Sequence, residues 1–152
     1  MTIAIGDRAP AFDLTSDDGS KVGLGDFKGR SLVVYFYPKA FTPGCTTQAC
    51  DLRDDYDRFI AAGYAVVGIS PDAPDKLARF RQEYRLPFPL LADTDHAVAA
   101  AYGAWGTKKN FGREYQGIIR STFVIDGSGV VTEAWYNVKA SGHADRLLRQ
   151  LG

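Results

Sequence analysis

The chain has 152 residues, of which 45% are hydrophobic and 24% are charged, and its 18 basic residues balance 18 acidic ones. This length fits a single domain, which we expect to span residues 1–152. A net charge of zero gives no electrostatic reason to expect nucleic acid or an anionic membrane as a partner, and every apolar run is too short to cross a bilayer.

The N-terminal sequence MTIAIGDRAPAFDL lacks a basic region followed by a long apolar run. We therefore expect no secretory signal and a cytoplasmic location. Asp18 and Gly19 follow this segment and indicate the turn of a first β-hairpin.

Two strands are predicted next, SLVVYFYP at 31–38 and YAVVGIS at 64–70, because both runs are dense in β-branched and aromatic residues. A helical pattern lies between them and ends at Gly63, a typical residue just beyond a helix. Its apolar positions recur every three or four residues: Ala49, Leu52, Tyr56, Phe59 and Ile60. Nearly continuous apolar strands separated by a helix predict parallel strands that are buried on both faces.

A second helix is predicted from Pro74 to Arg85, with Asp72 as its N-cap, and a short third helix follows Asp93. Two further strands, GIIRSTFVID and VVTEAWYNV, are joined by the turn DGSG, and SGHADRLLRQLG predicts a final helix. The order of elements predicts an α/β fold with a central mixed sheet and helices on both faces.

The C-terminal half contains one segment without a clear pattern and both histidines of the chain. The segment 105–117 has no clear periodicity, and we interpret it as a long irregular loop of the kind that is often functional. His96 and His143 lie near the predicted helix starts, where we expect both side chains to face solvent.

Both cysteines of the chain lie in the short sequence FTPGCTTQAC. Thr42 is a good N-cap candidate, which puts Pro43 at the first helical position and Cys45 inside the first turn. Unpaired backbone N–H groups and the positive end of the helix dipole favour an anion there. We therefore expect the Cys45 thiol to ionise more readily than a free cysteine, and a nearby cation would add to the effect.

Cys50 follows Cys45 by five positions on the same predicted helix. Five helical steps separate the two Cα atoms by roughly 8.6 Å, whereas a disulfide requires Cα atoms within about 7 Å. The two residues can pair only if the first two turns unwind, so the spacing favours a redox switch over a permanent bridge. Two unrelated buried cysteines remain the alternative. The two cysteines do not have the C-x-x-C spacing of a thioredoxin motif. The two histidines, His96 and His143, do not have the spacing of zinc ligands.

Pro38, Thr42, Pro43 and Cys45 form the pattern P-x-x-x-T-P-x-C at a strand-to-helix junction. Together with GDRAPAFDL near the start and GREYQGIIRSTFVIDGSG toward the end, this pattern makes the sequence strongly resemble the peroxiredoxins over nearly its whole length. The resemblance is to the bacterioferritin comigratory protein or peroxiredoxin Q subfamily. It implies a thioredoxin-like fold of the peroxiredoxin variant, with an N-terminal β-hairpin extension.

The same resemblance implies a role for each site residue. Cys45 would be the peroxidatic nucleophile and Cys50 the resolving cysteine. Thr42 would hydrogen-bond the thiolate and the peroxide, Pro38 would shield the pocket, and Arg120 would supply the cation. No metal and no organic cofactor is implied.

The expected function is that of a thiol-dependent peroxidase for hydrogen peroxide and organic hydroperoxides. The sulfenic acid formed on Cys45 would be resolved by Cys50 as an intramolecular disulfide, which thioredoxin or a similar dithiol would reduce. Resolution within one chain favours a monomer. Two alternatives remain: a peroxide sensor that passes oxidation to a partner by disulfide relay, and a thioredoxin-like disulfide reductase.

Overall fold

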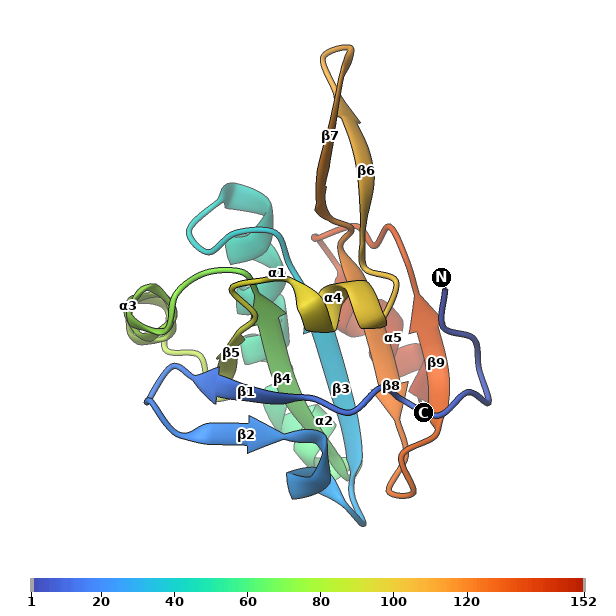
Figure 1. The fold of residues 1–152 in the computed structure, drawn as a ribbon. Coiled ribbons are helices and arrows are strands. Elements are labelled where there is room, and N and C mark those ends of the chain that lie inside the picture. The colour runs from blue at the N-terminus through green and yellow to red at the C-terminus, as the bar shows by residue number, and fades with distance from the viewer. Residues whose placement is uncertain (1, 152) are drawn as a thin grey trace.

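The computed structural model describes residues 2–151, apart from the side chain of Asn110. Its central feature is a mixed sheet formed by β1 (Asp13–Ser16), β2 (Lys21–Gly23), β3 (Ser31–Phe36), β4 (Tyr64–Ser70), β5 (Leu90–Ala92), β8 (Ser121–Ile125) and β9 (Val131–Trp135). The strand order is β2-β1-β5-β4-β3-β8-β9 (Figure 1). Strands β3, β4 and β5 run parallel, and the remaining pairs are antiparallel. The mixed sheet predicted from the sequence is confirmed.

Helices cover both faces of this sheet: α1 (Pro43–Asp54), α2 (Tyr56–Ala61), α3 (Pro74–Tyr84), α4 (Ala97–Ala101), α5 (His143–Leu151) and the 3-10 helix η1 (Leu24–Phe27). In Figure 1, α1, α2 and α5 lie behind the sheet and α4 lies in front of it. Side chains alternate along a strand, so Val33 and Tyr35 of β3 enter one hydrophobic cluster, whereas Val34 and Phe36 enter the other. The central strands are therefore buried on both faces, as predicted.

The helix predicted between β3 and β4 is in fact two helices. Asp55 separates α1 from α2 with φ −101° and ψ 8°, outside the helical values. After this break Phe59 is fully buried, while Ile60, predicted to be inward, is 43% exposed. Gly63 follows α2 with φ +90°, as expected for a residue that ends a helix.

The segment predicted to be an irregular loop is a regular hairpin. Strands β6 (Trp105–Asn110) and β7 (Arg113–Ile118) pair with each other as a separate two-stranded sheet. This hairpin, which we call the β6–β7 arm, projects away from the body of the molecule (Figure 1). Most of its side chains are exposed, so no alternation of apolar and polar residues marks its strands. The prediction of a loop was wrong for that reason.

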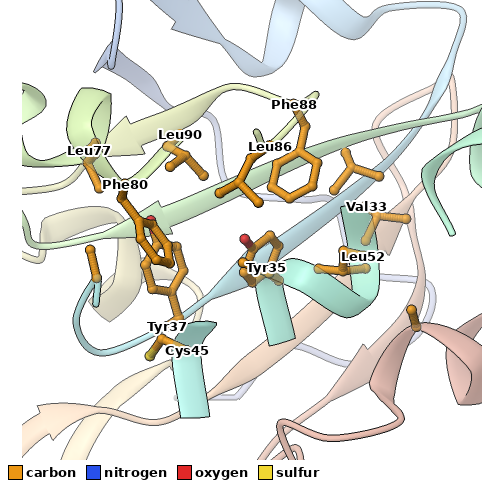
Figure 2. Close-up of a cluster of buried hydrophobic side chains, with 14 of the residues drawn as sticks. Val33, Tyr35, Tyr37, Cys45, Leu52, Leu77, Phe80, Leu86, Phe88 and Leu90 are labelled. Atoms are coloured by element: carbon orange, nitrogen blue, oxygen red, sulfur yellow. The ribbon is translucent and has the colours of Figure 1, made fainter. Parts of the chain in front are cut away.

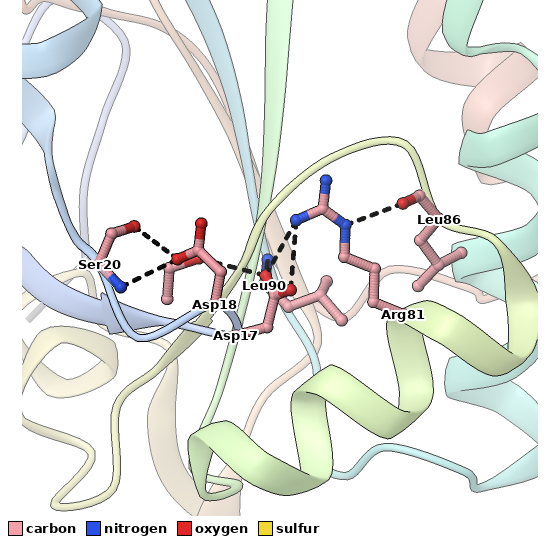
Figure 3. Close-up of polar contacts among 7 residues, drawn as sticks. Asp17, Asp18, Ser20, Arg81, Leu86 and Leu90 are labelled. Atoms are coloured by element: carbon pink, nitrogen blue, oxygen red, sulfur yellow. Dashed lines mark hydrogen bonds and ion pairs between the residues drawn. The ribbon is translucent and has the colours of Figure 1, made fainter.

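The N-terminal hairpin is fixed to α3 by a partly buried ion pair (Figure 3). Arg81 of α3 donates from Nη1 to both carboxylate oxygens of Asp17, at 3.1 and 3.2 Å. The same carboxylate accepts the backbone N–H of Leu90 at 3.1 Å, and Arg81 Nε donates to the Leu86 carbonyl oxygen at 3.0 Å. These bonds join β1, α3 and β5.

Among residues 2–151, no helix combines the length and the apolar character needed to cross a membrane.

His143 was expected to face solvent, but it is fully buried at the start of α5. Its Nε2 atom lies 2.8 Å from the Thr122 hydroxyl, and its ring lies edge-on to Trp135. Burial, and then the charges of Arg146 and Arg120, lower the pKa of His143 to about 4. The prediction was wrong because the first turn of α5 is inserted against the sheet, which a short amphipathic pattern could not reveal.

Candidate active site

Cys45 lies in the first turn of α1, at the edge of the sheet where the parallel strands β3 and β4 end. The carboxyl ends of parallel strands are the usual position of a site in an α/β fold. The side chain is only 1% exposed and belongs to the hydrophobic cluster that contains Tyr37 and Phe80 (Figure 2). The sulfur is therefore largely screened from bulk water.

The start of α1 follows the sequence prediction, with one difference. Thr42 has extended backbone angles, Pro43 occupies the first helical turn, and the Thr46 N–H donates to the Thr42 carbonyl oxygen at 2.9 Å. The Thr42 hydroxyl, however, donates to the Lys39 carbonyl oxygen at 2.8 Å rather than capping the helix. The side chain thus leaves the first-turn N–H groups free to face an anion.

Arg120 connects the sulfur to a second buried group. Its Nη2 atom donates to Cys45 Sγ at 3.3 Å, and its Nη1 atom donates to Gln48 Oε1 at 2.6 Å. Gln48 is fully buried one turn after Cys45. The planar guanidinium is therefore fixed from two sides, and one of its nitrogens is directed at the sulfur.

Gly44 permits this close approach. A Cβ atom built on Gly44 would lie 3.3 Å from Arg120 Nη2 and 3.8 Å from the Cβ of Ala140. The guanidinium thus passes directly over the first turn of α1. The sequence offered no separate signal for this contact, because Gly44 and Arg120 lie far apart in the chain.

Asp72 anchors the loop that carries Pro38 and Thr42. Its carboxylate accepts the Ala40 N–H at 2.8 Å and the Ser70 hydroxyl at 2.9 Å, and it pairs with Lys76 at 3.1 Å. The predicted role of Asp72 as the N-cap of α3 was wrong, because Ala73 occupies that position. The carboxylate instead connects the loop before α1 to the end of β4, a contact that no local pattern could reveal. Pro38 is half-buried within this loop.

Cys50 lies on the same unbroken helix as Cys45, and both are free thiols. Cys50 is half-buried, and burial raises the pKa of its thiol, while Arg53 lowers it to a smaller extent. The structure therefore brings together Cys45, Arg120 and Gln48, and it keeps Cys50 apart from them along the helix.

Lys108, on β6, was not identified from the sequence. It shares with Arg120 the lining of a cavity of about 440 Å³ between the arm and residues 137–138. Burial and the positive charge of Arg120 lower the pKa of Lys108. A Cβ on Gly117 would lie 3.2 Å from Lys108 Cδ, so the aliphatic part of the lysine packs against the neighbouring strand. The cavity beside Arg120 thus carries a second positively charged side chain.

This arrangement suits nucleophilic chemistry at sulfur. A buried cysteine in the first turn of a helix is paired with a guanidinium, and a second cysteine lies on the same helix. Within the described part of the chain, no group of three or more histidine, cysteine or acidic side chains is placed to hold a metal ion.

Comparison with known proteins gives a consistent result. Residues 5–134 match the model of the AhpC/TSA family. A relative in Mycobacterium tuberculosis, whose name as a peroxiredoxin is provisional, is 56% identical over 146 residues, which cover 96% of this chain and 93% of the relative. Peroxiredoxin Bcp of Bacillus subtilis is 47% identical over 151 residues, covering 99% and 96%. The solved structure of Xanthomonas campestris peroxiredoxin Q has a TM-score of 0.87 at 37% identity, covering 92% of this chain and 89% of that one. The thioredoxin-like peroxiredoxin fold expected from the sequence is confirmed.

Proposed function

Because this chain belongs to the AhpC/TSA family and to its Bcp or peroxiredoxin Q branch, it is a thiol-dependent peroxidase, and we propose that it works through Cys45 and Cys50 with thioredoxin as its reductant. The observation that carries this proposal is the contact between Arg120 and the sulfur of Cys45. A guanidinium against a buried sulfur stabilises the thiolate, which is the nucleophilic form.

In the first step the Cys45 thiolate attacks the terminal oxygen of a hydroperoxide, either hydrogen peroxide or an organic one. An S–O bond forms and the O–O bond breaks, so sulfur loses two electrons. The leaving oxygen takes a proton and departs as water or an alcohol, and Cys45 becomes a sulfenic acid. Arg120 is placed to stabilise the charge as it moves from sulfur to the leaving oxygen.

Two other residues support this step. The Thr42 hydroxyl donates its one proton to the Lys39 carbonyl oxygen, so it does not donate to the Cys45 thiolate as the resemblance implied, but its oxygen stays available to accept the O–H of an incoming peroxide. Pro38 is half-buried in the anchored loop before α1, where it limits the access of water to the pocket.

The second step joins the two cysteines. The Cys50 thiol condenses with the sulfenic acid of Cys45, which forms an S–S bond and releases water. Because an intact α1 holds the two sulfurs apart, its first turns must unwind. In the folded helix, burial raises the pKa of the Cys50 thiol. Unwinding removes that burial.

A dithiol protein, thioredoxin, then reduces the bond by exchange, leaving two thiols on this chain and a disulfide on thioredoxin. No step requires a metal or an organic cofactor. No step requires a second copy of this chain, so we propose a monomer, and a cytoplasmic location supplies the reduced dithiol.

A coupled assay with thioredoxin, its reductase and NADPH tests the proposal over several peroxides. Cys45→Ser should abolish peroxide consumption. Cys50→Ser should still be oxidised once but should lose turnover with thioredoxin. Full turnover by the Cys45→Ser protein would contradict the assignment of Cys45 as the nucleophile. A single oxidation of the wild type without turnover would instead favour a sensor, and disulfide reduction without peroxide would favour a reductase.

A further inference from the structure

The β6–β7 arm leaves the body of the molecule at the same edge where α1 begins (Figure 1). Its base is connected directly to the candidate site, because β7 ends at Ile118 and Arg120 follows two residues later. Each strand has six residues, which gives the arm a length of about 20 Å. A partner that touches both the tip of the arm and the start of α1 must therefore be a macromolecule.

The tip of the arm carries a residue that the folding of the hairpin does not explain. Phe111 is 98% exposed and has φ +52°, and Gly112 follows with φ +77°. Positive φ at both turn residues is the pattern of a type I′ turn, which favours asparagine, aspartate or glycine at its first position. A bulky residue is unfavourable there. An exposed aromatic side chain in a strained position is expected where another molecule binds.

The arm also carries excess positive charge in a chain whose net charge is zero. It contains Lys108, Lys109 and Arg113 against the single acid Glu114. Glu114 pairs with Lys109 at 3.6 Å, while Lys108 and Arg113 have no acidic partner within the described residues. A second exposed aromatic residue, Tyr115 at 45%, lies on β7. This surface is complementary to one that is acidic and apolar.

We propose that the β6–β7 arm is the docking element for the dithiol protein that reduces this chain, with Phe111 as the apolar anchor. The occupant is a protein with acidic and apolar surface around its reactive cysteine. Bound to the arm, it would lie over the start of α1, where Cys45 becomes accessible once the helix unwinds. This inference rests on the proposed function, because it assumes that a dithiol protein completes the cycle.

Phe111→Asn separates docking from folding, because asparagine suits the turn better than phenylalanine. We expect the KM for thioredoxin to rise about tenfold. The rate of Cys45 oxidation by peroxide, and turnover with the small reductant dithiothreitol, should stay unchanged. The matched control is Ile5→Asn, which removes another exposed apolar residue, 66% exposed and next to the Gly6 that bonds to Val131 at the opposite edge of the sheet. It should leave all three quantities unchanged.

The charge of the arm gives a second measurement. Arg113→Glu should raise the KM for thioredoxin and should make that KM depend less on the salt concentration. Lys28→Glu, an exposed charge before the start of β3, is the control.

Several results would overturn the inference. An unchanged KM for thioredoxin in Phe111→Asn would remove the docking role alone. An equal loss with dithiothreitol would show that the arm supports the site instead. A wild-type dimer that the Phe111→Asn change dissociates would identify a second copy as the occupant. A wild-type protein reduced no faster by thioredoxin or glutaredoxin than by dithiothreitol would overturn the reductant assignment together with the docking role.

Discussion

The Nη2 atom of Arg120 lies 3.3 Å from the sulfur of Cys45, although 75 positions separate the two residues in the chain. The contact exists only when the start of β8 lies beside the start of α1. It also depends on Gln48, which holds the other end of the guanidinium at 2.6 Å. The reactivity of the cysteine is therefore a property of the folded state.

Arg120→Lys should slow the oxidation of Cys45 by about a hundredfold. Lysine retains the charge, but its donors all lie on one nitrogen, so it cannot reproduce the planar pair of bonds that Arg120 makes from Nη1 to Gln48 and from Nη2 to Cys45. Stopped-flow fluorescence at several peroxide concentrations gives the rate constant. Arg79→Lys, which changes an exposed arginine paired with Asp75 on α3, is the control. A rate equal to that of the wild type would show that the charge alone is sufficient.

Oxidation should loosen the segment 42–52. In the reduced form, α1 is held by Leu52 in the core, by the bond from the Gly142 N–H to Asp51 at 2.8 Å and by the bond from Arg53 to the Tyr84 carbonyl oxygen at 2.9 Å. Formation of the Cys45–Cys50 disulfide removes the helical bonds of its first turns, so their amide protons should exchange faster. Hydrogen exchange followed by mass spectrometry on both redox forms measures this. Equal exchange in the two forms would contradict unwinding.

The free energy of unfolding should fall as the pH drops from 6.5 toward 4. The folded chain holds His143 with a pKa of about 4, lowered from 6.5 mainly by burial. The unfolded chain therefore takes up a proton in this range before the folded chain does. The lost stability reaches about 3 kcal/mol at the lower end. Urea unfolding from pH 7.5 to 4.5 measures the slope, and His143→Gln should flatten it. An identical slope in the variant would exclude His143 as the cause.

Asp17→Asn should lower the free energy of unfolding by about 1–3 kcal/mol, because it removes a partly buried charge that accepts two bonds from Arg81. The Leu90 N–H can still donate to the amide oxygen. Thermal or urea unfolding measures the loss, and peroxidase activity should persist. Asp75→Asn is the control, since the Asp75–Arg79 pair is exposed and its atoms are 3.7 Å apart. That change should cost less than about 1 kcal/mol. Equal losses of unfolding free energy in the two variants would show that the Asp17–Arg81 pair stabilises the fold no more than the exposed Asp75–Arg79 pair does.

The sequence predicted the elements whose side chains alternate between core and solvent or lie wholly in the core. Strand β3 and helix α1 belong to this class, because hydrophobic periodicity follows directly from burial. The β6–β7 arm escaped prediction because it has no buried face, and its Phe111–Gly112 turn does not carry the usual asparagine. The break at Asp55 escaped as well, because it falls inside a pattern that remains amphipathic on either side.

The site was predictable in part for a similar reason. Pro38, Thr42 and Cys45 lie within one short segment, so local rules place them at a helix start. Arg120 was identified through family resemblance, since no local pattern connects it to a cysteine so distant in the chain. The contact of Asp72 with the Ala40 N–H and the position of Lys108 depend on how separate elements pack. Such contacts require the three-dimensional structure.

The break at Asp55 sets a mechanical limit on the redox cycle. Helix α1 has 12 residues and contains both cysteines, whereas α2 begins immediately afterwards and inserts the fully buried Phe59 into the core. Because α2 keeps its own attachment, the melting of α1 does not have to propagate into it. The protein can rearrange the segment that carries its chemistry on every turnover while the sheet and the remaining helices stay in place.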